Sequence, residues 1–543
     1  MLVGMFIVRR KLSGKDRWCV LLCQSQREGT KVRQKTIKYF GVAHNVDELE
    51  LLTKQAKSDL RKLSKDSEGT KRGRNPNNVP LGDLLEVARV TEGFHAAIGP
   101  CFDKLGLASV LTKTRYQQLR DLVIARVAEP SSKLRTSRLL QSSFQKELSV
   151  DQIYRLMDSL VDLEDVIKLK VFNATKKRMQ SQPINLLLFD VTTLYFESQR
   201  RDGLRENGYS KDHKIGEVQV VLALATTSDG SPVGYHLFPG NTAEVKTLLM
   251  CIKKWRDDFQ IRNTIVVADR AMLSETNLSL MEAEGLTYVV AAKLRSLPVA
   301  LKREILAKNA AAVEEEDQEP CKIQEHEYQG RRLVVNYSRS RADKDEGDRE
   351  RLIQRLKGKL TASDNPQKLI SNRGYLKYID EKNKGKLILN EDKITEDAKW
   401  DGLHGVITND KTTKSLDLLH RYRNLWVIEE SFRINKHTLA MRPIYHFSPK
   451  RVSMHILICY LAFAVTRYIH QDVNDPEDPI SIEGIREALA SIETSILKDK
   501  EGQLFSLPAP LNKEASKVYG ALRLSRPRVP RALNSREATH FVV

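Results

Sequence analysis

The chain has 543 residues, 41% of them hydrophobic, which is enough for about three or four packed units with a sizeable core. Its 89 Lys and Arg residues outnumber its 70 Asp and Glu residues, and the formal charge of +19 favours a polyanionic partner such as nucleic acid, although a generally basic protein is the simpler alternative. Six cysteines without paired spacing disfavour a zinc site or a disulfide scaffold and indicate reduced thiols.

No segment is expected to enter a membrane. The N-terminus lacks the basic start, apolar centre and cleavage site of a signal peptide. The most apolar stretch, residues 454–469, has an uninterrupted core at 456–465, far shorter than the ~20 residues that span a bilayer. We therefore expect a buried helix there and a cytoplasmic protein.

Residues 1–80 are expected to form a strand and helix region that ends in a basic linker. Short strands are predicted at residues 6–8 and 18–22, followed by a basic run to Gly41 and a helix over 46–63. Residues 64–80 are polar, basic and rich in Gly, Asn and Pro, which is typical of a linker or a flexible arm.

Residues 81–180 show helical periodicity and are expected to form a small helical domain. Pro130 interrupts the helices, and Ser149 is a plausible cap for a later one. Lys133, Arg135 and Arg138 follow the interruption. They are either part of a scaffold or contacts to DNA, and the sequence does not separate these alternatives.

Residues 181–296 change character, because apolar strands alternate with helices. The predicted elements, in order, are strands at 186–196, 218–226 and 233–238, a helix at 243–259, a strand at 264–269, a helix at 274–284 and a strand at 288–292. Three strands followed by helix, strand, helix and strand is the order of an α/β, ribonuclease-H-like sheet.

Two further segments complete the chain. Residues 297–400 are more charged and poorer in apolar periodicity, and we interpret them as an insertion before the closing helices of the core at 401–475. The last stretch, residues 476–543, contains Pro-rich and basic patches and is left as a tail without assigned structure.

Two aspartates stand out in the predicted sheet. Asp190 lies within an apolar strand, where an unpaired carboxylate costs several kcal/mol unless a metal ion or a neighbour such as Thr192 or Thr193 compensates it. Asp269 ends another strand, where open sheets place their ligands, although a helix cap is an equally common use of such a residue. The pair is a stronger indication of a metal site than either residue alone.

A third carboxylate lies in the segment YRNLWVIEESFRINK. Its helical spacing predicts one face with a carboxylate flanked by cations, beside an apolar stripe of Leu425, Ile428 and Phe432. The predicted face comprises Tyr422, Trp426, Glu429, Arg433 and Lys436. An ordinary amphipathic helix with a Glu429 and Arg433 pair at i, i+4 is the alternative.

Taken together, four motifs resemble those of the cut-and-paste DDE transposases of bacterial insertion sequences. They are FDVTTLYFE around Asp190, FPGNTAEVKTL from Phe238, VVADRAM around Asp269 and YRNLWVIEESFRINK around Glu429. More narrowly, the chain resembles the branch with a β-rich insertion before the catalytic glutamate and a tyrosine-arginine-glutamate-lysine helix motif. The resemblance covers about residues 180–470.

The resemblance implies a ribonuclease-H-like core in which Asp190, Asp269 and Glu429 bind two Mg²⁺ or Mn²⁺ ions. Tyr422 and Lys436 match the tyrosine and lysine of the motif, whereas its arginine falls at Leu425, so Arg433 is a candidate substitute. Arg270, directly after Asp269, is a further candidate DNA contact. Glu429 is preferred to Glu430 because it precedes Lys436 by seven residues.

The resemblance also implies double-stranded DNA partners, namely terminal inverted repeats bound by the first 180 residues and target DNA. It implies a homodimer in the synaptic complex, associated with the bacterial nucleoid. Two alternatives remain: a structure-specific nuclease with the same core, and a catalytically decayed transposase that acts as a DNA-binding repressor.

Overall fold

The computed structural model describes residues 5–12, 17–28, 31–68, 81–180, 184, 186–196, 199–208, 217–259, 265–269, 274–314, 322–362, 377–382, 386–534 and 537. The chain divides into two compact units. The first comprises Met1–Ala88, Ile496–Leu507 and Val529–Val543, and the second comprises Arg89–Ser495 and Pro508–Arg528.

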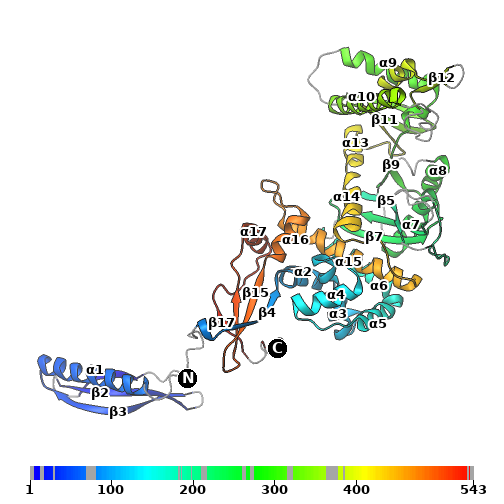
Figure 1. Ribbon diagram of the computed structural model, residues 1–543. Coiled ribbons are helices and arrows are strands. Elements are labelled where there is room, and N and C mark those ends of the chain that lie inside the picture. The colour runs from blue at the N-terminus through cyan, green and yellow to red at the C-terminus, as the bar shows by residue number, and fades with distance from the viewer. Residues whose placement is uncertain are drawn as a thin grey trace. The chain divides into compact units, whose positions relative to one another are not determined.

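The N-terminal segment forms a three-stranded antiparallel sheet beside one helix (Figure 1). The elements are β1 (Met5–Lys11), β2 (Trp18–Glu28), β3 (Lys31–Ala43) and α1 (Val46–Glu68). Asn45 starts α1 by accepting a hydrogen bond from the Glu48 amide, and the Glu48 carboxylate accepts one from the His44 amide. The two predicted strands and the helix are present, and the basic run to Gly41 forms the third strand.

The next segment is helical, as predicted, except at its start. Its elements are η1 (Leu81–Asp83), β4 (Leu85–Thr91), α2 (Gly93–Asp103), η2 (Leu107–Ser109), α3 (Lys113–Ala128), α4 (Lys133–Phe144), α5 (Val150–Leu160), η3 (Val161–Leu163) and α6 (Glu164–Arg178). Ser149 caps α5 in a reciprocal capping box with Gln152. The prediction of helix from residue 81 is wrong, because β4 is a strand. It pairs with a strand that lies some 400 residues away in sequence.

That partner lies in the C-terminal stretch, which is folded rather than a structureless tail. It contains α16 (Ile482–Ala490), β15 (Glu493–Lys498), β16 (Leu504–Pro508), α17 (Lys513–Ala521) and β17 (Arg531–Ala532), and the sheet order is β17-β16-β15-β4. Ile496 and Phe505 are buried in these strands. The apolar residues are too few to reveal strands whose hydrogen-bonding partners are distant in sequence.

The largest sheet has eight strands in the order β10-β11-β14-β9-β8-β5-β6-β7. Its first part follows the predicted order of elements: β5 (Leu186–Tyr195), β6 (Gln219–Thr226), β7 (Pro232–Pro239), α7 (Glu244–Phe259), β8 (Ile265–Ala268), α8 (Glu275–Ala283) and β9 (Thr287–Ala291). Strands β5, β8 and β9 are parallel, and β6 is antiparallel to both β5 and β7.

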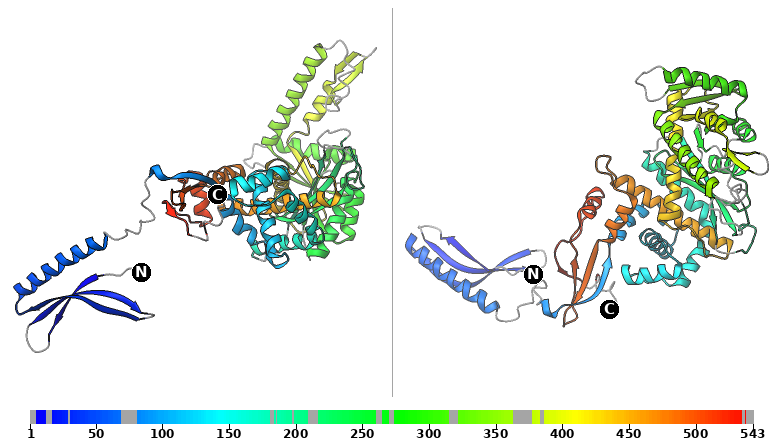
Figure 2. Two further views of the ribbon diagram at one scale, coloured as in Figure 1. Left: turned by 60° about the horizontal axis from the view of Figure 1, so that its bottom comes forward. Right: turned by 45° about the horizontal axis from the view of Figure 1, so that its top comes forward.

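The predicted insertion is mixed rather than β-rich. After η5 (Leu294–Ser296), it contains α9 (Val299–Glu314), β10 (Lys322–Tyr328), β11 (Arg331–Tyr337), α10 (Arg339–Ala362), β12 (Ile379–Lys382), β13 (Lys386–Leu389) and α12 (Glu391–Ala398). The 24-residue α10 is so highly charged that its helical period is hard to see in the sequence. Strands β10 and β11 join the main sheet through β14 (Leu403–Thr408), whereas α10 and the β12–β13 hairpin extend away from it (Figure 2).

The closing helices are α13 (Ser415–Arg423), α14 (Trp426–Arg433) and α15 (Pro449–Val473), with a π-helical turn, η7 (Ile434–Thr438), after α14. Helix α15 has the length and composition of a membrane span, but 94% of its most apolar window is buried inside the structure. The prediction of a buried helix at residues 454–469 is confirmed.

Helices cover both faces of the main sheet, with α7 and α8 on one side and α13 and α14 on the other (Figure 1). Side chains along β5 alternate between the two layers, since Leu187 and Phe189 belong to the core under α7 and α8, and Leu188 belongs to the core under α13, α14 and α15. This alternation decides which face carries each polar residue of the strand.

Candidate active site

Asp190 and Asp269 occupy neighbouring positions on parallel strands. Phe189 of β5 is opposite Ala268 of β8, so the two aspartates are the next pair of residues along these strands, and adjacent strands lie about 5 Å apart. Leu188 and Val267, two residues earlier, both belong to the core under α13, α14 and α15. Strand alternation therefore directs both carboxylates to that face of the sheet.

Two of the local alternatives for these aspartates, the cap of α8 for Asp269 and the Thr193 hydroxyl for Asp190, are not realised. Helix α8, which follows β8, is capped by Ser274, whose hydroxyl accepts a hydrogen bond from the Asn277 amide, so Asp269 is not its cap. The Asp190 carboxylate accepts a hydrogen bond from the next amide, that of Val191, at 2.7 Å. The buried Thr193 hydroxyl has no hydrogen-bond partner and does not compensate Asp190.

Helix α14 carries Glu429 over the same face, because it packs against β5 and β6. The predicted apolar stripe of Leu425, Ile428 and Phe432 is buried. Glu429 is exposed and makes no side-chain hydrogen bond or ion pair within the part of the chain that the structure describes.

The single helix predicted from Tyr422 to Lys436 is wrong, although Trp426, Glu429 and Arg433 are all exposed on α14. Tyr422 is near the end of α13, a turn at Asn424 and Leu425 separates it from α14, and Lys436 lies in the π-helical turn η7. Leu425 is only 5% exposed, because it fills the core at the start of α14. Each irregularity changes the direction of the side chains that follow it, so the period of one helix does not apply throughout.

The adjacent Glu430 has a different environment from Glu429. Its carboxylate accepts a hydrogen bond from Nη1 of the buried Arg467 at 2.9 Å and lies 3.8 Å from Nη2 of Arg433. Arg433 therefore pairs with Glu430 at i, i+3, and the alternative of an i, i+4 pair with Glu429 is wrong. The Arg433 side chain is 72% exposed and available to a ligand.

The three candidate carboxylates are not drawn into one cluster. Among the residues that the structure describes, no three His, Cys, Asp or Glu side chains lie close enough together to hold a metal ion. The structure thus brings Asp190 and Asp269 together and places α14 over them, while the Glu429 side chain stays apart. Arg270 lies outside the described residues.

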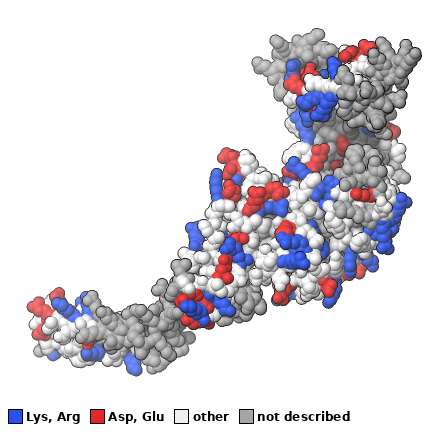
Figure 3. All heavy atoms as spheres, in the orientation of Figure 1, with Lys and Arg blue, Asp and Glu red and all other residues white. Residues whose placement is uncertain are grey.

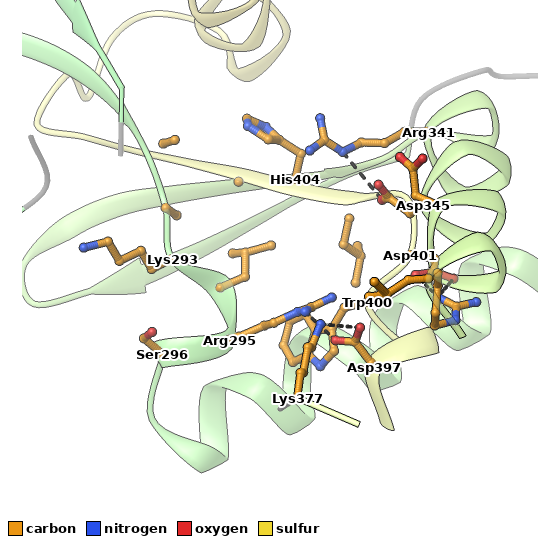
Figure 4. A pocket seen from close by; sticks show the side chains of 18 of the residues that line it. Lys293, Arg295, Ser296, Arg341, Asp345, Lys377, Asp397, Trp400, Asp401 and His404 are labelled. Carbon is orange, nitrogen blue, oxygen red and sulfur yellow. Dashed lines mark hydrogen bonds and ion pairs between the residues drawn. The ribbon is translucent and has the colours of Figure 1, made fainter. Parts of the chain in front are cut away.

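Asp269 also lines a cavity of about 860 Å³ that the sequence did not reveal (Figure 4). Residues 291–296, α10, α12, β14 and the end of α13 supply the other walls, including Trp400, His404 and Tyr422. The ring centroids of His404 and Tyr422 lie 5.0 Å apart. Burial, together with the charges of Arg341 and Arg423, lowers the pKa of His404 to about 4, so its imidazole is neutral at pH 7.

Most cations of this cavity are held by aspartates. Arg295 and Lys377 both pair with Asp397, as Figure 4 shows, and Arg349 pairs with Asp401. Although burial pushes the pKa of Asp397 upward, hydrogen bonds from Lys377 and Tyr378 and the nearby cations lower it overall. The cavity wall is therefore polar and nearly balanced in charge.

Basic residues that were candidate DNA contacts in the helical segment differ in exposure. Lys133 is buried, and its ammonium group has no hydrogen-bond partner, so a contact to DNA is excluded in this conformation. Arg135 is exposed and pairs with Glu129 at 2.7 Å, and Arg138 is exposed. On the face drawn in Figure 3, basic and acidic side chains are mixed rather than segregated.

Comparisons with known proteins identify the family of the chain. No curated protein sequence matches it. One similar solved structure is a piggyBac transposase synaptic complex with hairpin DNA, with 12% sequence identity and a TM-score of 0.34 over 74% of this chain and 77% of that chain. The family model described as "Transposase DDE domain" matches residues 181–465, which is more than half of the sequence. The chain belongs to the DDE transposase family.

Proposed function

We propose that this protein is a DNA transposase that cleaves DNA at the ends of a mobile element and joins those ends to target DNA, with Asp190, Asp269 and Glu429 as its catalytic carboxylates. The observation that carries the proposal is the parallel register of β5 and β8, which makes Asp190 and Asp269 neighbours on one face beneath α14. Membership of the family supplies the reaction class.

The fold that we propose for the core is ribonuclease-H-like. The strand order β7-β6-β5-β8-β9, with β6 antiparallel to its neighbours and the remaining central strands parallel, supports this assignment. Helices on both faces of the sheet are consistent with it. In this arrangement β14, β11 and β10 extend the core sheet beyond β9.

The donor set fits hard divalent cations. Asp190 and Asp269 offer carboxylate oxygens at adjacent positions, and Glu429 is an exposed carboxylate on α14, which packs against β5. These three residues would hold Mg²⁺ or Mn²⁺. When two such ions are bound, they activate water or a DNA 3′-hydroxyl and stabilise the leaving oxygen of an in-line displacement at phosphorus.

Residues around the carboxylates would grip the DNA. The exposed guanidinium of Arg433 lies one turn beyond Glu429 and can bind a phosphate through two hydrogen bonds. Lys436 and Tyr422 occupy the motif positions on either side of α14, and Arg270 follows Asp269. We assign recognition of the terminal inverted repeats to the first 180 residues and synapsis of the two ends to a homodimer.

The test is an excision assay on a plasmid that carries the coding region with its native flanking DNA. The protein with Mg²⁺ should release a linear fragment whose ends coincide with inverted repeats, and the purified fragment should then join to a second plasmid. A nuclease of the same fold would cut branched DNA without requiring those ends and would leave the fragment unjoined.

A further inference from the structure

Helix α14 contains two successive glutamates, only one of which has a side-chain partner among the residues that the structure describes. Glu429 is exposed, whereas the Glu430 carboxylate accepts a hydrogen bond from Arg467 at 2.9 Å. Arg467 belongs to the buried helix α15, and its side chain is only 5% exposed. A charged residue at such a position within an apolar helix needs a specific partner, and Glu430 provides it.

Arg467 also binds the turn between β6 and β7. Its Nη2 donates to the carbonyl oxygen of Asp229 at 3.0 Å, and Gln471, one turn later, donates to the same oxygen at 3.1 Å. Gly230 has φ of +80°, and a Cβ there would lie 2.0 Å from Nη2 of Arg467. The turn is therefore shaped to receive the guanidinium group.

Helix α14 is short, so the contact with Arg467 adds to the fixation that its buried apolar stripe provides. It has eight residues, preceded by the turn at Asn424 and Leu425 and followed by the π-helical turn η7. Successive residues of an α-helix point about 100° apart, so the direction of Glu430 determines the direction of Glu429. Arg467 thus connects the rotation of α14 to the hairpin whose first strand, β6, pairs with β5 at Asp190.

We propose that Arg467 is a positioning residue that, through Glu430, sets the rotation of α14 so that Glu429 can reach Asp190 and Asp269. This inference rests on the proposed function, because it takes Glu429 as the third carboxylate. It also assigns Glu430 to a supporting role, since a carboxylate held by a buried arginine is not available as a metal ligand. Disturbing the pair should weaken metal binding without removing any ligand.

The experiment titrates the full chain with Mn²⁺ and measures free Mn²⁺ by electron paramagnetic resonance. The variants are Arg467→Lys, which keeps the charge, Glu430→Gln, and Gly230→Ala, which obstructs the guanidinium without altering either member of the pair. Each should raise the half-saturating Mn²⁺ concentration at least about tenfold. Cleavage of pre-nicked DNA should recover at high Mn²⁺, because the ligands themselves remain.

A matched control separates positioning from stability. Glu282→Gln removes one partner of Arg331, a similarly buried arginine whose Nε lies 2.7 Å from Glu282. This variant should lower the melting temperature as Glu430→Gln does, yet bind Mn²⁺ like wild type. A wild-type Mn²⁺ response in folded Arg467→Lys and Gly230→Ala would overturn the proposal.

Two further variants distinguish this proposal from the proposed function. If Glu430→Gln lost Mn²⁺ binding while Glu429→Gln kept it, Glu430 would be the ligand and the positioning role would be wrong. If Asp190→Asn bound Mn²⁺ as tightly as wild type, the proposed active site itself would fail. Loss of binding in Asp190→Asn and Glu429→Gln, with no change in the Arg467 and Gly230 variants, would refute only the positioning role.

Discussion

Lys133 provides a sharp test of the packing of the helical segment. Its ammonium group is buried without a hydrogen-bond partner, close to the guanidinium of Arg126. Burial, reinforced by the Arg126 charge, lowers the pKa of Lys133 from 10.5 to about 7. His446 and His455 nearby are also buried, and burial lowers the pKa of His446 to about 3, so neither histidine adds charge near neutral pH.

The sign of the effect on stability follows from proton binding. Between pH 7 and 10.5 the unfolded chain holds a proton on Lys133 that the folded chain has lost, so the free energy of unfolding rises with pH across this window. At about 1.4 kcal/mol per pH unit, the gap between the two pKa values corresponds to about 5 kcal/mol. Lys133→Met replaces the amine with a flexible apolar side chain of similar length and should remove this dependence.

The measurement is the melting temperature of wild type and Lys133→Met from pH 6 to pH 10. We expect the variant to be more stable at pH 6, by up to about 5 kcal/mol, with the two curves converging as the pH approaches 10. Measuring the difference between the two proteins cancels the other groups that titrate in this range. Parallel curves, or a variant that is less stable at pH 6, would refute the assignment of a buried, unpaired amine.

Three other predictions concern the DNA contacts and the helix motif. Arg433→Ala should reduce cleavage at least about tenfold. Arg433→Lys should restore only part of the activity, because lysine cannot form the bidentate phosphate contact. If both variants cleaved DNA as wild type does, that contact would be excluded. Leu425→Arg should lower the free energy of unfolding by about 2–5 kcal/mol in denaturant titrations, since position 425 is buried. It should not improve DNA binding, and a gain in affinity for DNA would contradict the buried position. Deletion of residues 1–68 should make the slope of the logarithm of the DNA-binding constant against log salt concentration shallower by about 0.9 for each lost phosphate contact. An unchanged slope would show that this segment does not bind DNA.

The sheet could be predicted because its strands carry their own signal. Residues 186–196 form a run of apolar and β-branched side chains that suits burial on both faces, and a charged residue within it is conspicuous. Asp190 could be chosen on this ground, and Asp269 because it ends another apolar strand. Their adjacency could not be read from one strand at a time, because it depends on the parallel pairing of β5 with β8.

The helix motif was harder to predict because nothing in its sequence marks the break. Asn424 and Leu425 are neither glycine nor proline, and the apolar spacing continues past them, so one uninterrupted helix was the simplest interpretation. The partner of Glu430 was equally hidden, since Arg467 lies 37 residues further along the chain. The one indication in the sequence is the arginine within the apolar segment of α15, since a buried arginine requires an acidic or polar partner.

Segments with distant partners were the least predictable. The sequence predicts helix where β4 lies and no structure for the C-terminal strands, because each of these strands is stabilised by the others in one sheet. Lys133 shows the same limitation for single residues, since a basic side chain at the start of a helix is ordinarily exposed. Its burial depends on the packing of α3 and α15 in the same core.

The most direct test of the central claim is the Mg²⁺-dependent cleavage of an element end by Asp190→Asn, compared with wild type at equal protein concentration. The variant removes one carboxylate from the pair formed by Asp190 within β5 and Asp269 directly after β8, and it leaves the N-terminal segment unchanged. We predict that cleavage falls below detection while binding of the same DNA end stays within about twofold of wild type. Cleavage close to that of wild type would contradict the assignment of the active site to the face of the sheet beneath α14.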